Sequence, residues 1–374
     1  MTFLLSEEQS MLRDSARDFL QGQAPVSLQR HLRDGDVALG YEQTVWKQAI
    51  ELGWLAAVFP EDRGGLGVGY AGLGTVFELM GRNLSALPLL SQVVLCGELL
   101  LRSASAGQQA RWLPVLMDGT QRFALALEES GRHTPRPVHT RARREGDAWV
   151  LDGEKWFVLD AVGAQQLIVT ACLEDQSLGL FVVDATDHGV SLQRIRMVDS
   201  RNSARVQFQG VRVADDRRLC AADDAALSLD AALDRARICL AAEAMGLTRE
   251  AFERTVSYLK ERVQFDVVIG SFQALQHRVA RLYVELELLE SCVRAALAAI
   301  DSDAADLPIL ASIAKARASD MCEKVLNEAV QLHGGIGVTD EFDLGLFVKR
   351  ARMLQHTLGD GIFHRDRYAQ LRGF

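Results

Sequence analysis

The spacing of apolar residues changes twice along this chain of 374 residues, and this change constrains the fold more than any other feature. Over residues 1–120, apolar side chains recur at the helical spacing of three to four residues. Between about 121 and 220, short apolar runs and alternating apolar and polar residues take over, and from 225 onward the helical spacing returns. The sequence therefore predicts an α+β fold, with helices first, a compact β domain in the middle and a helical bundle at the end.

Polar and glycine-rich stretches mark where the predicted helices begin and end. Ser6, followed by the acidic Glu7 and Glu8, predicts the N-cap of the first helix. The glycine-rich stretch at 58–69 predicts a loop, and a turn at 300–306 separates two helices of the last third. Four helices with short connections indicate a bundle. These helices are predicted at 227–260, 272–300, 307–333 and 343–356.

The middle segment carries the strand signals. The Asp152-Gly153 pair stands between two apolar runs and predicts a hairpin turn. Residues 167–170 and 178–184 predict short apolar strands, whereas 204–213 alternates apolar with polar residues and predicts a strand with one solvated face. The expected domains are an N-terminal helical domain at 1–120, a central β domain at 121–222 and a C-terminal helical bundle at 223–374.

Composition argues against several classes of protein. Lys and Arg number 41 against 50 Asp and Glu, which gives a net charge of −9 and disfavours a nucleic acid as the main partner. No stretch reaches the ~18 consecutive apolar residues of a membrane helix, and the N-terminus lacks the basic region of a signal peptide. Six dispersed cysteines, without a Cys-x-x-Cys pair or a histidine at ligand spacing, predict reduced thiols in the cytoplasm and no metal site.

Two segments of the last third suit a nucleotide. Arg262 ends a predicted helix, a short turn carries Phe265, and the next helix begins with Gln273. The stretch Gln331-Leu-His-Gly-Gly-Ile-Gly337 follows another helix, and its glycines would let backbone N–H groups approach a ligand closely. The glycine pattern alone fits a helix C-cap and turn as well, so it gains weight only in company with other motifs.

The order and separation of these motifs resemble the acyl-CoA dehydrogenase family. The similarity covers nearly the whole chain. It includes the Pro-Glu-x-x-Gly-Gly-Leu-Gly loop at 60–67 and the Gly-Asp-x-x-Val-Leu-Asp-Gly-x-Lys segment at 146–155. The last third, through residues 358–369, is most similar to small subunits of the pimeloyl-CoA dehydrogenase type and to the paired subunits of bacterial steroid side-chain degradation.

The resemblance implies both a fold and a chemistry. The fold has an N-terminal helical domain, a central β-barrel domain and a C-terminal four-helix bundle. The cofactor is FAD and the substrate is an acyl-CoA thioester, from which a carboxylate removes the α proton while hydride passes from Cβ to the flavin. An electron-transfer flavoprotein is the implied electron acceptor, and the implied setting is fatty acid or steroid catabolism in the cytoplasm.

The cofactor contacts that the resemblance implies divide into two groups. In the family, the nucleotide part of FAD is held across the dimer by residues that are all present here: Arg262, Phe265, Gln273, Gln331, Gly334 and Gly335. The positions that face a subunit's own flavin ring have lost two hydroxyl groups, because they hold Leu127 and Leu159. Phe157 keeps an aromatic ring beside them.

The two family positions for the catalytic base hold no carboxylate, since they are Leu358 and Ala236. Glu243, in an apolar helical run, and Asp360, beside two glycines, are the candidate bases instead. Glu243 could equally be a structural carboxylate paired with a cation of another helix, and Asp360 a turn or capping residue. His364 could serve the flavin ring or a phosphate, or be structural.

These observations support the hypothesis of an FAD-dependent acyl-CoA dehydrogenase subunit in an α2β2 heterotetramer with a complementary subunit. This chain would hold the nucleotide part of the partner's FAD, while its own ring-facing site is partly degenerate. One alternative is a self-sufficient homo-oligomer that uses Glu243 or Asp360. Another is a catalytically silent subunit that only completes its neighbour's FAD site.

Overall fold

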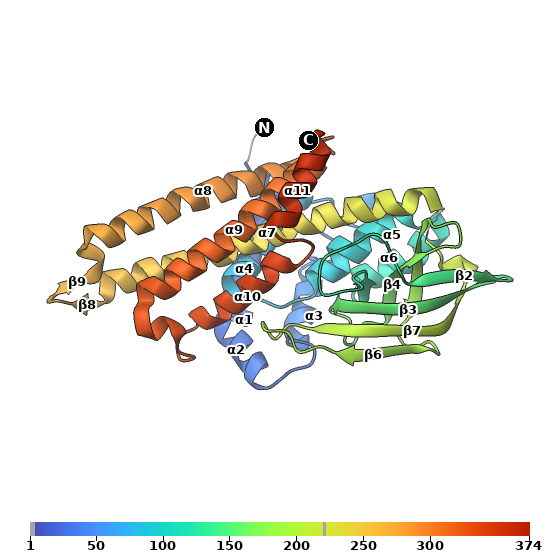
Figure 1. Ribbon diagram of the computed structural model, residues 1–374, viewed down its shortest axis with the longest axis horizontal. Coiled ribbons are helices and arrows are strands. Elements are labelled where there is room, and N and C mark those ends of the chain that lie inside the picture. Colours follow the sequence, from blue (N-terminus) through green and yellow to red (C-terminus); the bar gives the residue numbers. More distant parts are fainter. Residues whose placement is uncertain (1–3, 220–221) are drawn as a thin grey trace. The chain divides into compact units, whose positions relative to one another are not determined.

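A computed structural model describes residues 4–219 and 222–374 (Figure 1). Cys220, one of the six predicted thiols, lies outside these residues. Helices, strands and further helices follow one another along the chain in the predicted order. The chain forms two compact units, each of which combines segments that are distant in the sequence. Unit 1 consists of Met1–His31, Val68–Ser85 and Arg237–Phe374, and unit 2 of Leu32–Gly67 and Ala86–Ala236.

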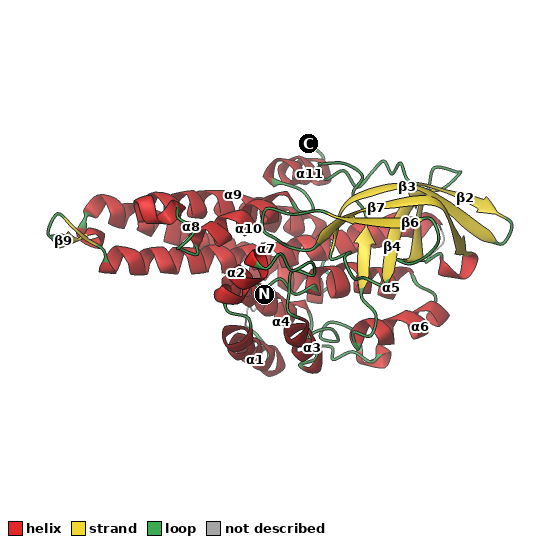
Figure 2. Ribbon diagram, turned by 90° about the horizontal axis from the view of Figure 1, so that it is seen from below, coloured by secondary structure: helices red, strands yellow, loops and turns green. Residues whose placement is uncertain are grey.

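Unit 1 is mostly helical, and its long helices lie side by side (Figure 2). The first helix begins in a capping box, in which Gln9 N donates to Ser6 Oγ at 3.2 Å and Ser6 N donates to Gln9 Oε1 at 3.0 Å. Ser6 is thereby confirmed as the predicted N-cap. The helices are α1 (Glu7–Gln23), α4 (Tyr70–Asn83), α7 (Ala222–Glu261, from residue 237 on), α8 (Gln273–Asp301), α9 (Leu307–His333), α10 (Leu344–His356) and α11 (Gly361–Arg372), and α2 (Val26–Asp34) is shared between the units.

The four helices predicted for the last third are confirmed as α7, α8, α9 and α10. The sequence pattern does not predict α11, nor the small hairpin of β8 (Val263–Gln264) and β9 (Val267–Val268) that follows α7. Among the described residues, no helix is long and apolar enough to cross a membrane.

Two glycines let α4 cross α7 at very short range. A Cβ atom at Gly81 would lie 2.0 Å from the carbonyl oxygen of Glu243, and one at Gly246 would lie 1.8 Å from that of Glu78. Such distances are far below van der Waals contact, so only glycine fits at either position. The crossing therefore holds α4 against the middle of α7, backbone to backbone.

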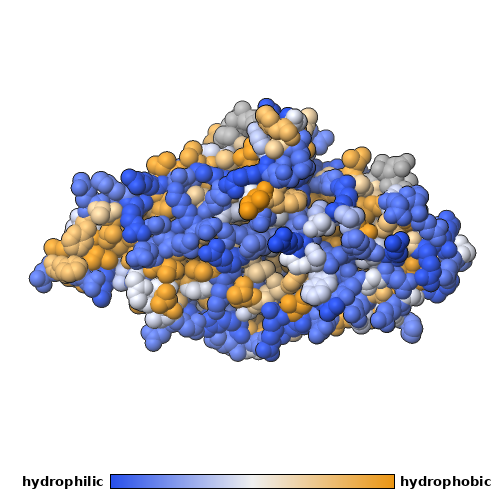
Figure 3. All heavy atoms as spheres, viewed as in Figure 1, coloured by the Kyte–Doolittle hydropathy of each residue, from blue (hydrophilic) through white to orange (hydrophobic). Residues whose placement is uncertain are grey.

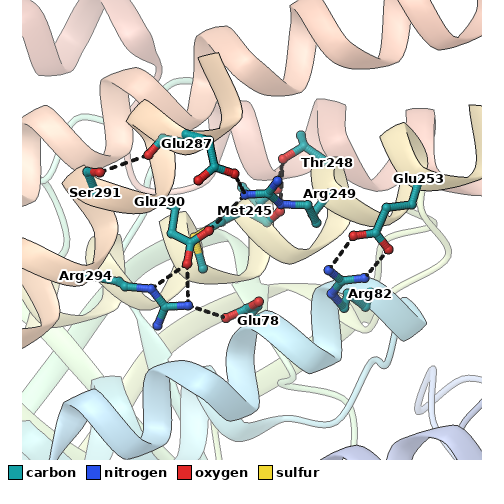
Figure 4. Close-up of polar contacts among 11 residues, drawn as sticks. Glu78, Arg82, Met245, Thr248, Arg249, Glu253, Glu287, Glu290, Ser291 and Arg294 are labelled. Atoms are coloured by element: carbon teal, nitrogen blue, oxygen red, sulfur yellow. Dashed lines mark hydrogen bonds and ion pairs between the residues drawn. The ribbon is translucent and has the colours of Figure 1, made fainter. Parts of the chain in front are cut away.

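Ion pairs between α4, α7 and α8 surround this crossing (Figure 4). Arg249 of α7 donates to Glu287 at 2.8 Å and to Glu290 at 2.9 Å, both on α8. Arg294 donates to Glu290 at 2.7 Å and lies 3.8 Å from Glu78 of α4. Burial raises the pKa of Glu78, although the charge of Arg294 opposes this shift. A partly buried charge network thus joins the same three helices.

Unit 2 is built on a seven-stranded sheet with strand order β1-β4-β2-β3-β7-β6, and β5 pairs with β4. Apolar side chains of the sheet form one core, in which Trp149, Leu151 and Phe181 are buried. The strands are β1 (Phe123–Ala126), β2 (Arg141–Glu145), β3 (Ala148–Leu159), β4 (Gln166–Cys172), β5 (Leu178–Asp184), β6 (Val190–Arg194) and β7 (Ser203–Ala214). The helices are α3 (Gln43–Glu51), a π-helix (Leu90–Gly97), α5 (Glu98–Ser103) and α6 (Ala106–Met117).

The predicted hairpin turn at Asp152-Gly153 is wrong. β3 runs through these residues as one strand, and the turn that joins it to β2 lies at Gly146 instead. The register between β3 and β7 shifts at this point, and Asp152 Oδ1 accepts a hydrogen bond from Gly210 N at 2.7 Å. Gly153 is required because a Cβ atom there would lie 2.7 Å from Cα of Thr140. The Asp-Gly pair therefore marks a bulge rather than a turn.

The other strand predictions are confirmed. The two short apolar runs of the middle segment lie within β4 and β5. In β7, Ala204, Val206 and Phe208 are buried whereas Gln209 is exposed, so one face of this strand packs on the core and part of the other is solvated.

The α4–α7 crossing predicts that Gly246→Ala lowers the free energy of unfolding by ~1–3 kcal/mol, as overpacking does, because the new methyl group would meet the backbone of α4. Urea unfolding followed by far-UV circular dichroism measures this change. Gly22→Ala in α1 is the control, since its Cβ position is open, and it should keep or gain up to about 1 kcal/mol of stability. Equal stability of the two variants would show that the helices do not cross as described.

Candidate functional site

The two segments with nucleotide-binding character lie together at one end of unit 1. A small apolar cluster of Leu259, Ile269 and Leu332 joins the end of α7, the segment after β9 and the end of α9. The ring of Tyr258 stacks on that of His333, with the ring centroids 4.5 Å apart. The C-terminal ends of α7 and α9, which carry the two predicted segments, are therefore neighbours.

The side chains and glycines of these segments are open to a ligand. All six predicted nucleotide contacts are exposed: Arg262, Phe265, Gln273, Gln331, Gly334 and Gly335. Within the described part of the chain, Arg262 has no ion-pair partner. Gly334 has a left-handed φ of 63°, and the Cβ positions of Gly334 and Gly335 meet no atom within 4 Å. Donor groups and open backbone thus meet at one exposed end.

This arrangement fits the diphosphate and adenosine end of a dinucleotide. The guanidinium group of Arg262 offers a planar fork of donors that matches diphosphate oxygens. Because Gly334 and Gly335 carry no side chain and their Cβ positions are open, a ligand can approach the backbone there closely, while the N–H group of Gly334 already donates to carbonyl oxygens at the end of α9. The amide of Gln331 offers both donors and an acceptor to a base or a ribose.

The predicted ring-facing segment lies in unit 2, where the chain leaves β1 and runs beside β3. Trp156 N donates to Glu128 O at 2.7 Å, which joins the stretch after β1 to the end of β3. Leu127 is buried, and Phe157 is half-buried with a left-handed φ of 48°. The structure therefore brings the segments of Leu127 and Phe157 together, but positions 127 and 159 supply no hydroxyl donor to a flavin ring.

Two consecutive glutamates of this segment accept hydrogen bonds from residues of the same unit. Glu128 accepts a hydrogen bond from His133 Nδ1 at 2.5 Å. Glu129 accepts from Thr140 N and from Lys155 Nζ, both at 2.8 Å. Lys155 is fully buried, and desolvation lowers its pKa to about 8, although the charge of Glu129 opposes this shift. Both carboxylates are committed to internal contacts, so this segment fits a flavin ring less well than the nucleotide end fits a diphosphate.

The sequence does not predict the internal hydrogen bonds of Glu128 and Glu129. Glu129 and Lys155 are 26 positions apart, and they meet only because the sheet folds β3 onto the stretch after β1. The one sequence signal is the adjacency of two acidic residues at the end of a strand.

Glu243, the first candidate base, is buried in a two-point ion pair. Arg350 of α10 donates from Nε to Oε1 and from Nη2 to Oε2, both at 2.8 Å, and Glu243 is 2% exposed. This geometry corresponds to the alternative considered in the sequence, a structural carboxylate paired with a cation of another helix. To act as a base, Glu243 would have to give up its hydrogen bonds to Arg350.

Asp360, the second candidate base, is the N-cap of α11. Its Oδ1 accepts a hydrogen bond from Phe363 N at 2.8 Å, and its backbone is extended, as is usual for N-cap residues. The two family base positions, Ala236 and Leu358, are buried and apolar. His364 is fully buried and contacts the carbonyl oxygen of Leu358, which corresponds to its structural alternative.

The ion pair predicts that Glu243→Gln lowers the free energy of unfolding by about 3–5 kcal/mol, because Arg350 would lose the buried carboxylate that accepts two of its hydrogen bonds. Combining Glu243→Gln with Arg350→Met should recover much of this loss, since neither charge of the pair then remains. Urea unfolding of the three proteins tests both statements. Full stability of the single variant together with lost turnover would instead assign Glu243 to catalysis.

Three domain models of acyl-CoA dehydrogenases match the chain. The N-terminal domain model matches residues 6–120, the middle domain model 123–211 and the C-terminal domain model 227–370. The matched regions succeed one another along the chain and leave only short stretches between them.

Similar proteins match over nearly the whole chain. This chain is 32% identical to acyl-CoA dehydrogenase FadE12 of Mycobacterium tuberculosis, and the match covers 94% of this chain and 92% of that protein. It is 31% identical to a chain in the structure of a variant of the Tcur3481–Tcur3483 steroid ACAD, with a TM-score of 0.87 and 98% of both chains covered. A chain of the ChsE4–ChsE5 complex from Mycobacterium tuberculosis has the same fold, at 24% identity, a TM-score of 0.91 and 100% of both chains covered.

Proposed function

We propose that this chain, which belongs to the acyl-CoA dehydrogenase family, is one subunit of a heteromeric FAD-dependent enzyme that desaturates an acyl-CoA thioester. Its family makes it an oxidoreductase of the class that acts on CH–CH bonds with a flavin. In the proposed α2β2 complex, it supplies the nucleotide-binding half of an FAD site whose ring lies on a complementary subunit.

One contrast between two sets of residues carries this proposal. The residues suited to the nucleotide are exposed, and Arg262 has no ion-pair partner among the described residues. The ring-facing segment instead has apolar residues at 127 and 159, and its carboxylates, Glu128 and Glu129, are bonded internally. A chain that formed complete flavin sites by itself would need both the nucleotide-binding residues and a ring-facing segment with hydrogen-bond donors.

Exposed apolar side chains surround the nucleotide segments. In the β8–β9 hairpin, Val263, Phe265 and Val267 are 56%, 83% and 41% exposed, and Val338 after α9 is 75% exposed. Figure 3 shows hydrophobic atoms at the end of unit 1 where Figure 1 places this hairpin. Exposed apolar side chains in such number near one end of a unit are typical of a protein contact. A partner subunit that covers this end would bring its FAD to Arg262.

Bound FAD supplies the hydride acceptor for the oxidation. In this chain, Arg262 would bind the diphosphate, and the nucleotide would lie close to the open backbone at Gly334 and Gly335. We assign the carboxylate that removes the α proton to the complementary subunit, because Glu243 and Asp360 both have structural contacts here.

The relatives support the heteromer and narrow the acyl group. The Tcur3481–Tcur3483 structure, at 31% identity, names two proteins in one steroid ACAD. By this likeness we include an acyl-CoA of steroid catabolism in the proposal. An acyl-CoA of fatty acid catabolism, a cytoplasmic location and an electron-transfer flavoprotein as the electron acceptor enter the proposal from the resemblance to the family.

Expression of the chain alone tests the proposal. We expect a protein with substoichiometric flavin and no turnover, because its ring-facing segment lacks the hydroxyl donors. Co-expression with a complementary family member, sought first in a neighbouring reading frame, should give a mixed oligomer with full flavin content and acyl-CoA dehydrogenase activity. Visible flavin absorbance and native mass spectrometry measure both. A yellow homo-oligomer with full FAD content and normal turnover would refute the heteromer.

Replacement of Arg262 tests which half of the site this chain provides. In the mixed complex, Arg262→Ala should weaken FAD binding by about 10- to 100-fold, since a hydrogen bond to a charged group contributes about 1.5–3 kcal/mol. Lys260→Ala is the matched control, because Lys260 is an exposed cation in the last turn of α7, two residues away. Fluorescence titration of the flavin-free complex gives both affinities. Equal affinities in the two variants would remove Arg262 from the site.

A further inference from the structure

The turn between α10 and α11 is a tight, buried structure with unusual backbone angles. Leu358 and Gly359 have left-handed φ values of 56° and 105°, and both residues are buried. A Cβ atom at Gly359 would lie 2.4 Å from Cδ1 of Phe363 and 2.8 Å from Nε2 of His364. The turn therefore needs glycine at 359 and packs directly on the first helical turn of α11.

Buried side chains from two other helices hold the carbonyl oxygens of this turn. Lys315 of α9 donates from Nζ to Gln355 O at 3.1 Å and to Gly359 O at 2.7 Å. Arg237 of α7 donates from Nε to Leu358 O at 3.2 Å. Lys315 and Arg237 are only 1% and 2% exposed. The turn is thus fixed by two cations that have been taken out of water.

His364 of α11 completes this cluster from the opposite side. Its Nε2 lies 3.1 Å from Leu358 O, and since a carbonyl oxygen can only accept, Nε2 carries the proton. Nδ1 is then an unprotonated acceptor, and it is buried without a hydrogen-bond partner among the described residues. The side chain as a whole is fully buried. His364 therefore fits this turn only as a neutral ring.

We propose that the turn between α10 and α11 is an acid-labile latch, which opens when His364 takes a second proton. A proton on Nδ1 would create a buried N–H group that has no acceptor in the described structure. It would also add a third positive charge beside Lys315 and Arg237, which already hold the same turn. Opening the turn hydrates the imidazolium and relieves both costs.

The charged groups that face His364 do not compensate such a proton. Arg237 faces it from α7, Lys315 from α9 and Arg367 from its own helix, and all three are cationic. Asp360 is the carboxylate within the turn, and its Oδ1 is committed to capping Phe363 N. Cys322 of α9 lies near Lys315, and burial raises the pKa of its thiol to about 12, so it stays neutral.

The direction of the pH effect follows from these surroundings. Burial, together with Arg237 and Lys315, lowers the pKa of His364 to about 2, whereas an exposed histidine titrates near 6.5. Between these values the open turn binds a proton that the closed turn excludes, so the closed turn loses stability as the pH falls below about 6.5. Lys315 acts in the same direction but at higher pH, because burial lowers its pKa from 10.5 to about 7, so its contribution changes between these two values and is complete below about 7.

Hydrogen exchange of the purified protein tests the latch. The reporter amides are those of Phe363 and His364, which donate to Asp360 in the closed turn. After correction for intrinsic exchange, their opening should increase by roughly 30-fold between about pH 7.5 and about pH 5, with little change in the middle of α8. Below about pH 6.5, where His364 is the group that gains a proton on opening, log opening should rise by about one for each unit that the pH falls.

Two histidine variants separate the latch from general acid sensitivity. His364→Gln keeps a donor for Leu358 O but cannot take a proton, so its reporter amides should lose the pH dependence. His356→Gln is the control, because His356 is exposed at the end of α10, and it should keep the dependence. Should His364→Gln fail to fold, the wild-type pH profile decides alone. A wild-type profile without pH dependence, or the same dependence in His364→Gln, would overturn the latch.

Discussion

The close crossing of α4 and α7 is the contact on which unit 1 depends. Gly81 and Gly246 leave only backbone between the two helices, so α7 has little freedom to slide or rotate there. Three features elsewhere on α7 are placed by this constraint. Glu243 meets the arginine of α10, Arg237 reaches the turn after α10, and the end of α7 presents Arg262. One steric requirement thus positions a buried ion pair, the turn proposed as a latch and the segment proposed to bind a nucleotide.

Local sequence signals predict the parts of the fold that depend on interactions between residues close together in the chain. Ser6 caps α1 because its hydroxyl reaches an amide three residues away, and the alternation at 204–213 reports which face of β7 is buried. Asp152-Gly153 misleads because the same dipeptide suits a turn and a bulge, and distant neighbours make the choice. The sequence pattern does not predict α11 because the residue that this helix buries is His364, and a polar side chain does not contribute to the helical spacing of apolar residues.

The sequence predicts those parts of the candidate site that depend on the type of a residue. It does not predict the parts that depend on which distant residue a side chain contacts. An exposed arginine and a glycine-rich helix end are recognisable in the sequence, and the structure places Arg262 and Gly334 at one end of a bundle. The role of Glu243 could not be predicted, because Arg350 is 107 residues further along the chain. Buried charges need partners, but the sequence does not say which of 41 cations will be the partner.

The β8–β9 hairpin has a consequence for how the chain is produced. Phe265 and Asp266 both have left-handed backbone angles at its tip, and Phe265 points into solvent with little of its ring covered. In the proposed heteromer, an excess of this chain over its covering subunit would leave this apolar end exposed and open to self-association and to proteases. Balanced synthesis of the two proposed subunits would then protect this chain as well as complete the enzyme.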